Sequence, residues 1–354
     1  MMSKYYYILL QSFFIDIQYQ IPTLNSMIRF KKAEINKQNI PSSTGIFTFY
    51  DEHNIIFVSK TTNLDNGIRQ FFKIAKDDKN IFQIISQTTE IAYEEHSSLF
   101  AALIHQKKLE NRLYPEFNST IKPYEKYVYL GINFEKPPYL NVVEDIQQNQ
   151  FYIGPFKNRF FLFDLLDDLA ELLMFPVCPD EKPYPCERYK NDKCKGWCIK
   201  EKHEAYQKVI LPLIIPNEKL LSSKYREYEV FYNELQFEKA EKLKNKIQQI
   251  EKYFKYLKFI VVTKNLNLEF EDYGKDIIIK NGRINGKIEK GIKKEFPLVS
   301  VNYRKNEIMA FDKSQLAERR IVYNYLLKKN DKIILDKIEA VNKKFLLKLK
   351  TKLT

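Results

Sequence analysis

The sequence lacks any run of about 18 consecutive apolar residues, the length that a membrane-spanning helix requires. Its apolar beginning, residues 5–17, contains Asp16 and is followed by no small-residue cleavage site, so it is typical of neither an anchor nor a signal peptide. Repeats of fixed period are also absent. We therefore expect no membrane partner, and we expect residues 1–26 to be an N-terminal extension ahead of a more natural beginning at Met27.

Cysteine is also scarce, and its placement is informative. All four cysteines lie between residues 178 and 198, whereas a secreted disulfide-rich protein would distribute them widely, so we expect a reducing, cytoplasmic location. Four thiolates in so short a segment suit one metal centre, either Zn²⁺ or an iron–sulfur cluster, although the paired C-x2-C spacing of zinc ribbons is missing. The alternative is four unrelated free cysteines. The candidate ligands are Cys178, Cys186, Cys194 and Cys198.

The composition is that of a folded, basic protein. The chain has 354 residues, a length that allows about two or three compact units, and 44% of them are hydrophobic, so each unit can form an apolar core. Its formal net charge of +13 favours an anionic partner, either nucleic acid or an acidic membrane surface. An AT-rich genome also enriches lysine, asparagine and isoleucine, so the charge alone does not decide whether nucleic acid is bound.

Residues 44–60 contain two β-rich runs, TGIFTFY and NIIFVSK, joined by the turn sequence DEHN. Lys60 ends the second run, where a lysine can face a phosphate or simply mark the end of a strand. A helix is predicted for residues 63–76, a strand for residues 81–94 and a second helix for residues 94–113. These elements predict a small α+β domain in the order β-β-α-β-α.

The remaining sequence continues the α+β pattern. Strands are predicted at residues 127–134 and 150–156, with a helix at 159–175 that Pro176 terminates. The tail contains the hairpin signal DIIIKNGRING, then a helical stretch and a basic amphipathic end, KKFLLKLKTKLT, which we expect to cover the protein's own surface.

A long helical pattern runs from Ser222 to Phe259 without Gly or Pro. An amphipathic helix of this length cannot bury its apolar stripe alone, so it needs a helical partner, either within its own domain or in another protein. The stripe consists of Leu235, Ala240, Leu243, Ile247, Ile250 and Phe254, with Phe237 beside it.

Three segments in this order resemble the UvrC family of excinucleases. They are the GIY-YIG-like unit at residues 45–118, the YIGPF sequence at 152–156 with its helix and cysteine segment, and LQFEKAEKLKNKI at 235–247. The last is similar to the UVR motif through which the family binds the helicase UvrB. In length the chain is closer to the shorter Cho-like relatives. The resemblance implies a [4Fe-4S] iron–sulfur cluster in preference to zinc, and DNA and UvrB as partners.

The resemblance also implies an active site that this chain has altered. In the family, a tyrosine of the GIY strand activates water, a tyrosine of YIG and an arginine support the phosphate, and a glutamate holds one Mg²⁺ or Mn²⁺ ion. Here Phe47 and Phe57 replace the tyrosines, Gly67 replaces the arginine and Gln106 replaces the glutamate. Lys60 and Asn118 match the family pattern. Glu110 could supply a displaced carboxylate and Arg69 a displaced guanidinium, while His53 or His105 could replace the missing base.

We therefore expect a UvrC-like nucleotide excision repair protein of α+β class that binds DNA and UvrB and is weak or inert as a nuclease. An active structure-specific endonuclease with a rearranged metal site is the alternative, and a cluster-containing module without a DNA role is a third. The expected domains are an N-terminal extension (1–26), a GIY-YIG-like domain (27–125), a cysteine-rich cluster-binding region (126–215), a UVR helical hairpin (216–258) and an uncharacterised α+β C-terminal region (259–354). The expected UvrB-binding residues are Leu235, Phe237, Glu238, Ala240, Leu243 and Ile247. The sequence does not predict an oligomeric state.

Overall fold

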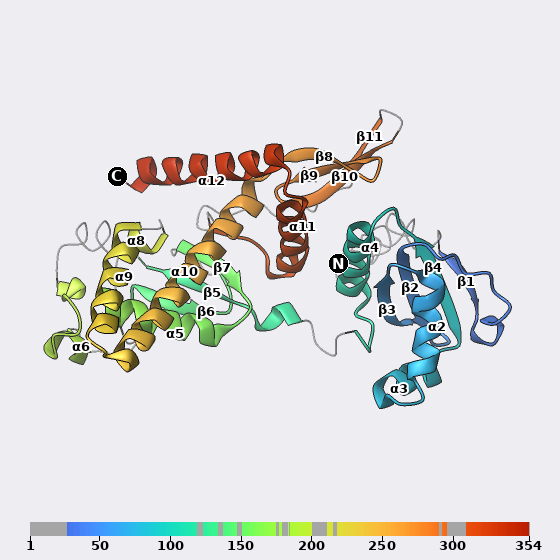
Figure 1. Cartoon of the computed structure of the whole chain (residues 1–354), viewed down its shortest axis with the longest axis horizontal. Coiled ribbons are helices and arrows are strands. Elements are labelled where there is room, and N and C mark those ends of the chain that lie inside the picture. The colour runs from blue at the N-terminus through green and yellow to red at the C-terminus, as the bar shows by residue number, and fades with distance from the viewer. Residues whose placement is uncertain are drawn as a thin grey trace, which may run out of the picture. The chain divides into compact units, whose positions relative to one another are not determined.

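A computed structural model of the chain shows an α+β protein, in agreement with the predicted fold class (Figure 1). The chain divides into two compact units, residues 1–122 and 123–354. The N-terminal extension predicted for residues 1–26 lies outside the described residues. The structure describes residues 27–118, 123–133, 137–146, 151–174, 177–178, 183, 185–199, 211–214, 218–289, 292–295 and 309–353.

The first unit is built on a four-stranded antiparallel sheet with the strand order β1-β4-β2-β3. Its central strand β2 is buried along its whole length, because helices cover both faces of the sheet. The β3 strand lies at one edge. The strands are β1 (Ile28–Lys31), β2 (Gly45–Tyr50), β3 (Ile55–Thr61) and β4 (Glu90–Glu95).

Helices α2 (Leu64–Ile74) and α4 (Leu99–Leu113) begin at residues that cap them. The Asn63 side chain accepts a hydrogen bond from the Asn66 amide, and the Ser98 side chain accepts one from the Ala101 amide. One core cluster joins the phenyl rings of β2 to α2, and a second joins Ile46 and Val58 to α4. Alternate β2 residues therefore contact different helices, as the two-residue period of a strand requires.

The strand predicted over residues 81–94 is partly wrong. Its first half is helix α3 (Lys79–Gln87), and only its second half is strand β4. The Asp78 carboxylate accepts hydrogen bonds from the Asn80 amide at 2.8 Å and the Ile81 amide at 3.0 Å, so it caps a helix. Isoleucine favours strands in general, but here its spacing forms the buried face of a helix.

The second unit contains a sheet of order β12-β7-β5-β6, in which β12 pairs in parallel with β7. The predicted strands at 127–134 and 150–156 correspond to β5 and β7, whereas β6 was not predicted. Helix α5 (Arg159–Leu173), at the position predicted from the sequence, packs into the same core as this sheet. The strands are β5 (Val128–Ile132), β6 (Leu140–Val143), β7 (Phe151–Phe156) and β12 (Met309–Ala310).

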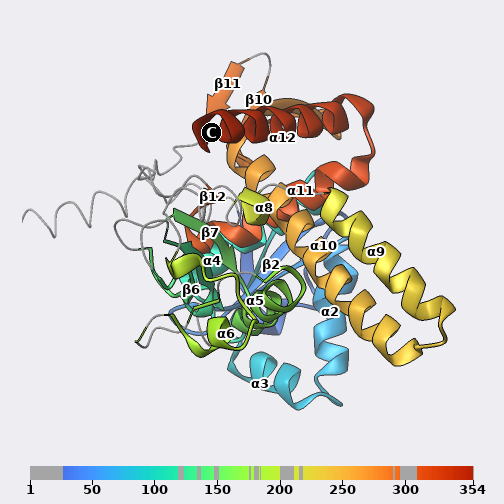
Figure 2. The same cartoon turned by 90° about the vertical axis from the view of Figure 1, so that its left-hand side faces the viewer.

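The long helical pattern forms two antiparallel helices, α9 (Glu218–Asn233) and α10 (Phe237–Asn265), which lie side by side (Figures 1 and 2). The uninterrupted helical pattern of the sequence is therefore divided between two helices, which form the helical hairpin expected of a UVR motif. The break occurs at Leu235, whose φ of 60° is left-handed and incompatible with a continuous helix. No Gly or Pro marks the turn, so no local signal for it is present in the sequence.

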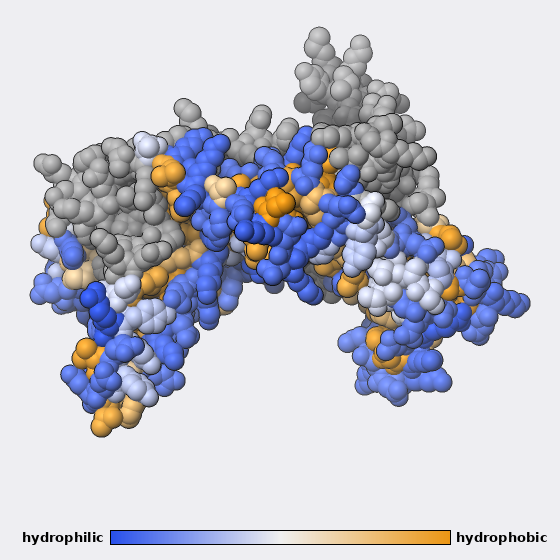
Figure 3. All heavy atoms as spheres, turned by 45° about the horizontal axis from the view of Figure 1, so that its top comes forward, coloured by the Kyte–Doolittle hydropathy of each residue, from blue (hydrophilic) through white to orange (hydrophobic). Residues whose placement is uncertain are grey.

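The C-terminal region adds a third sheet, of order β11-β10-β9-β8, and two helices. Asn281 and Gly282 have φ values of 50° and 68°, which confirms the predicted hairpin turn between β9 and β10. None of the described helices is long and apolar enough to cross a membrane. Hydrophilic residues predominate among the coloured residues of the face shown in Figure 3. The elements are β8 (Leu268–Asp272), β9 (Lys275–Lys280), β10 (Arg283–Glu289), β11 (Ile292–Glu295), α11 (Leu316–Lys329) and α12 (Lys332–Leu353).

Candidate functional site

The two phenylalanines that replace tyrosines lie in an aromatic cluster on the α2 face of the first sheet. Phe47 of β2 is 1% exposed, and its ring centroid lies 6.4 Å from that of Phe57 on β3. Phe71 of α2 contacts both, with centroid distances of 5.5 Å and 5.1 Å. Phe71 was not among the predicted site residues. Aromatic rings at these distances stabilise one another, but they offer no group that can accept a proton from water.

Gly67 lies where helix α2 comes very close to strand β3. A Cβ atom at this position would be 2.6 Å from the Thr61 hydroxyl oxygen, closer than real Cβ atoms approach another atom. An arginine side chain at position 67 would therefore require the helix or the strand to shift. The glycine therefore permits a close contact between the two elements.

Arg69 is held by the loop that precedes β2. Its Nε donates to the Asp65 carboxylate at 2.6 Å, and its terminal nitrogens donate to the carbonyls of Ile35 and Gln38 at 3.2 Å and 3.3 Å. The guanidinium is therefore engaged in local structure. Lys60 is half-buried and pairs across the sheet with Ile46, on the face that α4 covers.

Gln106, Glu110 and Asn118 form a hydrogen-bonded group, the amide–carboxylate cluster. One Glu110 oxygen accepts from the Gln106 amide at 2.7 Å and from the Asn118 amide at 3.3 Å, and the other accepts from Lys107 at 2.7 Å. Asn118 also pairs with both the amide and the carbonyl of Val58, on the open edge of β3. Both carboxylate oxygens of Glu110 are thus already engaged.

A second polar group lies where β4 ends and α4 begins, and we call it the Glu–His–His cluster. Glu94, His96 and His105 bring their side-chain ligand atoms within 4.8 Å of one another. Burial, and then the proximity of His96 and Lys108, lowers the pKa of His105 to about 4, so its imidazole is neutral near pH 7. Of these three residues, only His105 was named from the sequence, and there as a possible replacement for the missing base. The alternation of Glu94 and His96 along a strand, with a histidine on the next helix, was the available signal.

The four cysteines come together at the surface of the core of the second unit. Cys186 and Cys194 are buried, while Cys178 and Cys198 are half-buried and pack against that core. Burial, and then the proximity of the other three thiols, raises the pKa of Cys178 to about 12. The thiols are near enough to influence one another, and four sulfur donors in one segment are of the type that iron–sulfur clusters use. They are not among the described side chains whose ligand atoms gather within 4.8 Å of one another.

The residues expected to bind UvrB fall into two groups. Leu235 and Phe237, at the turn between α9 and α10, are 73% and 54% exposed. Glu238 is exposed beside them. The other three are at most 6% exposed and pack within the protein's own helices, so they would reach a partner only if the hairpin opened. Their role in binding UvrB stays a prediction. The buried residues are Ala240, Leu243 and Ile247.

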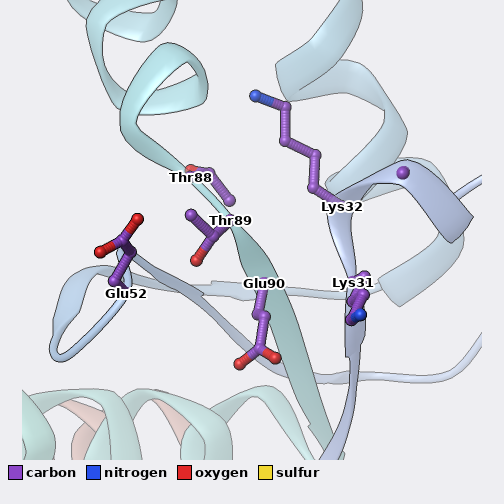
Figure 4. A pocket seen from close by; sticks show the side chains of 7 residues that line it. Lys31, Lys32, Glu52, Thr88, Thr89 and Glu90 are labelled. Carbon is purple, nitrogen blue, oxygen red and sulfur yellow. The ribbon is translucent and has the colours of Figure 1, made fainter.

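A hollow of about 550 Å³ on the first unit lies apart from these groups (Figure 4). Lys31, Lys32, Glu52 and Glu90 contribute charged side chains to its wall. The Lys32 ammonium donates to the Ile85 carbonyl at 2.6 Å, and Glu90 pairs with an arginine outside the wall. The hollow brings together none of the residues expected to act on a substrate.

Comparison with known proteins links the chain to one group. Residues 127–214 match a protein-family model described as the UvrC/Cho excinuclease middle domain. A UvrABC system protein C from Caldicellulosiruptor saccharolyticus is 26% identical over 258 residues, covering 68% of this chain and 41% of that relative. Another, from Levilactobacillus brevis, is 30% identical over 152 residues, covering 43% of this chain and 25% of that relative. The chain therefore spans less than half of these relatives.

Solved structures similar to about a quarter of the chain include a single UvrC domain. The GIY-YIG N-terminal endonuclease domain of UvrC from Thermotoga maritima, bound to magnesium as its catalytic divalent cation, is 21% identical. The match covers 25% of this chain and 99% of that domain, with a TM-score of 0.23.

Proposed function

The chain belongs to the UvrC family, and we propose that it takes part in nucleotide excision repair by binding DNA and a UvrB-like helicase. In this proposal its GIY-YIG-like unit supports binding and does not cut DNA through the site used by the family. The position of the family match, residues 127–214, and the relatives named above support the assignment to repair.

The aromatic cluster is the observation that carries the proposal. Hydrolysis of a phosphodiester needs a group that takes a proton from water and a ligand for a hard divalent cation. Phe47 and Phe57 supply no hydroxyl, and their rings pack against Phe71 instead of lining a polar site. Gln106 offers an amide, a poorer ligand for such a cation than a carboxylate.

The contacts of Glu110 argue against the alternative of an active, rearranged site. A carboxylate that replaced the lost glutamate would need an oxygen available to the cation. Three donors, on Gln106, Lys107 and Asn118, already bind the two Glu110 oxygens. Arg69, the other candidate replacement, is engaged with Asp65 and the loop before β2.

Incision of damaged DNA tests the proposal. The purified chain is incubated with lesion-containing duplex DNA and Mg²⁺ or Mn²⁺. We expect it to bind this DNA and to leave both strands uncut. Nicking that disappears in Glu110→Ala, and persists in the exposed control Glu116→Ala, would establish the active alternative. If the chain neither binds nor nicks DNA, its assignment to repair through DNA contact fails.

We also propose that Cys178, Cys186, Cys194 and Cys198 hold a [4Fe-4S] cluster, in which thiolates would replace the thiols. When bound, such a cluster fixes a protein loop and can exchange electrons. Anaerobically purified chain is expected to be brown, with about four irons per molecule, and Cys194→Ser is expected to lose the colour. A colourless protein holding one zinc would support the zinc alternative and contradict the cluster.

A further inference from the structure

Strand pairing, a backbone hydrogen bond and helix α4 position the three residues of the Glu–His–His cluster. Glu94 pairs with Ile46 in the β2–β4 ladder, and the His96 amide donates to the Thr44 carbonyl at 2.8 Å. His105 lies on α4, between Ala102 and Leu109 on the face of the helix that packs against the sheet. The side chains are 22%, 14% and 12% exposed for Glu94, His96 and His105, so their positions are restricted but still accessible to a small ion.

The ligand atoms of these groups lie within 4.8 Å of one another, so small movements of the side chains would bring them around one metal ion. His96 Nε2 and His105 Nδ1 are hydrogen-bonded at 3.0 Å, and a bound ion would replace this hydrogen bond and its shared proton. One oxygen of Glu94 lies 3.9 Å from His96 Nε2 and the other lies 3.8 Å from His105 Nδ1, at ion-pair distance. A tetrahedral Zn²⁺ ion with bonds of about 2.0–2.1 Å keeps its ligand atoms roughly 3.3 Å apart, within the range observed here.

The chemistry of the three groups selects among metal ions. Two imidazole nitrogens and one carboxylate suit Zn²⁺, whereas Mg²⁺ and Ca²⁺ prefer oxygen ligands alone. Zinc sites with three protein ligands of this kind keep a fourth position for water. We propose that Glu94, His96 and His105 bind a Zn²⁺ ion with water as the fourth ligand.

This zinc site is separate from both the amide–carboxylate cluster and the four cysteines. Gln106, the next residue after His105, points its amide to Glu110 and not to the Glu–His–His cluster. The ligands come from the end of β4 and from α4, so a bound ion would link the central sheet to the helix that covers it. The proposal goes beyond the proposed role in repair and does not depend on it.

Zinc content of the full chain tests the site while the cysteines remain unchanged. Metal-free wild-type protein and the variants Glu94→Gln, His96→Asn and His105→Asn are dialysed against buffered Zn²⁺, and bound zinc is measured. His53→Asn is the matched control, because His53 is an exposed histidine in the turn between β2 and β3. Wild type and the control are expected to hold one more zinc per chain than the ligand variants, whose affinity falls about 100-fold or more.

Two results would overturn the proposal. One is equal zinc content in all five proteins. The other is that Mg²⁺ at millimolar concentration displaces Zn²⁺ from the site. Imidazole ligands are expected to select Zn²⁺, so this result would contradict the proposal. Circular dichroism of each variant separates loss of the ion from loss of the fold, and Glu94→Gln and His96→Asn provide the test if His105→Asn unfolds.

Discussion

Side chains of similar shape replace the catalytic groups that the family pattern leads one to expect. Phe47 and Phe57 differ from tyrosine by one hydroxyl each, and Gln106 differs from glutamate by an amide nitrogen in place of an oxygen. The packing explains why such exchanges are tolerated. Phe47 fills a buried position among other rings, and the Gln106 amide donates to Glu110, a bond that a second ionised carboxylate could not make.

Restoring the hydroxyl at Phe47 is expected to destabilise the first unit. Phe47→Tyr would place a polar group at a position that is 1% exposed, among phenyl rings that cannot accept its hydrogen bond. An unsatisfied buried hydroxyl lowers the free energy of unfolding by about 1–3 kcal/mol. Amide hydrogen exchange of β2 would measure the loss.

Phe57→Tyr is the matched control, because Phe57 is only half-buried and its added hydroxyl can reach water. This change is expected to alter the free energy of unfolding by about 0.5 kcal/mol or less. Equal protection of β2 in both variants would mean that the aromatic cluster has room for a polar group, which contradicts its apolar packing.

Among the elements, the hairpin of α9 and α10 presents its apolar residues in two different ways. Ala240, Leu243 and Ile247 stabilise the protein itself, whereas Leu235 and Phe237 at the turn remain accessible. The Phe237 ring packs against Tyr232 of α9, with 5.5 Å between ring centroids, so the exposed surface is supported from within the hairpin. A partner can therefore bind the turn without unfolding either helix.

Phe237→Asp is expected to abolish co-purification of the chain with a UvrB-like helicase. The change places a charge in the centre of an apolar contact, and replacing a central aromatic residue typically lowers binding by about 2 kcal/mol or more, about 30-fold. Pull-down with the helicase is the measurement. Because Phe237 is 54% exposed, thermal unfolding should change little.

Phe160→Asp on α5 is the control, since Phe160 is 70% exposed at a distance along the chain from the hairpin. The Phe160→Asp variant should still co-purify with the UvrB-like helicase. Retained binding in Phe237→Asp, or equal loss in both variants, would exclude the turn as the contact surface. Leu243→Asp would not discriminate, because a charge at a position that is 6% exposed destabilises the hairpin itself.

For the molecule as a whole, the net charge of +13 is the property that bears most directly on DNA. Each phosphate neutralised by lysine or arginine releases a condensed counterion, and this release makes the affinity fall with salt. Net charge by itself does not place the contact surface on either unit.

Binding of the full chain to duplex DNA is expected to weaken steeply as salt increases. If about five phosphates are neutralised, log K against log salt has a slope of about −4.5, and affinity falls about 500-fold between 50 and 200 mM salt. Fluorescence anisotropy with labelled duplex measures the slope. A flat dependence, or no binding at the lowest salt, would mean that the positive charge reflects composition and not a nucleic-acid surface.

The sequence by itself determined the features that depend on local pattern. The first hairpin, helices α2, α4, α5 and α11, and the turn at Asn281 follow from residue periodicity, capping and turn chemistry, which act between near neighbours. The resemblance to the UvrC family likewise rested on short segments in a fixed order.

Tertiary structure decided the features that depend on distant residues. Whether residues 81–87 form a strand or a helix, and where the long helical pattern turns back at Leu235, depend on packing that a local window does not contain. The same holds for the Glu–His–His cluster. Glu94 and His96 meet His105 only because α4 folds back across the sheet, a contact set by burial of its apolar face.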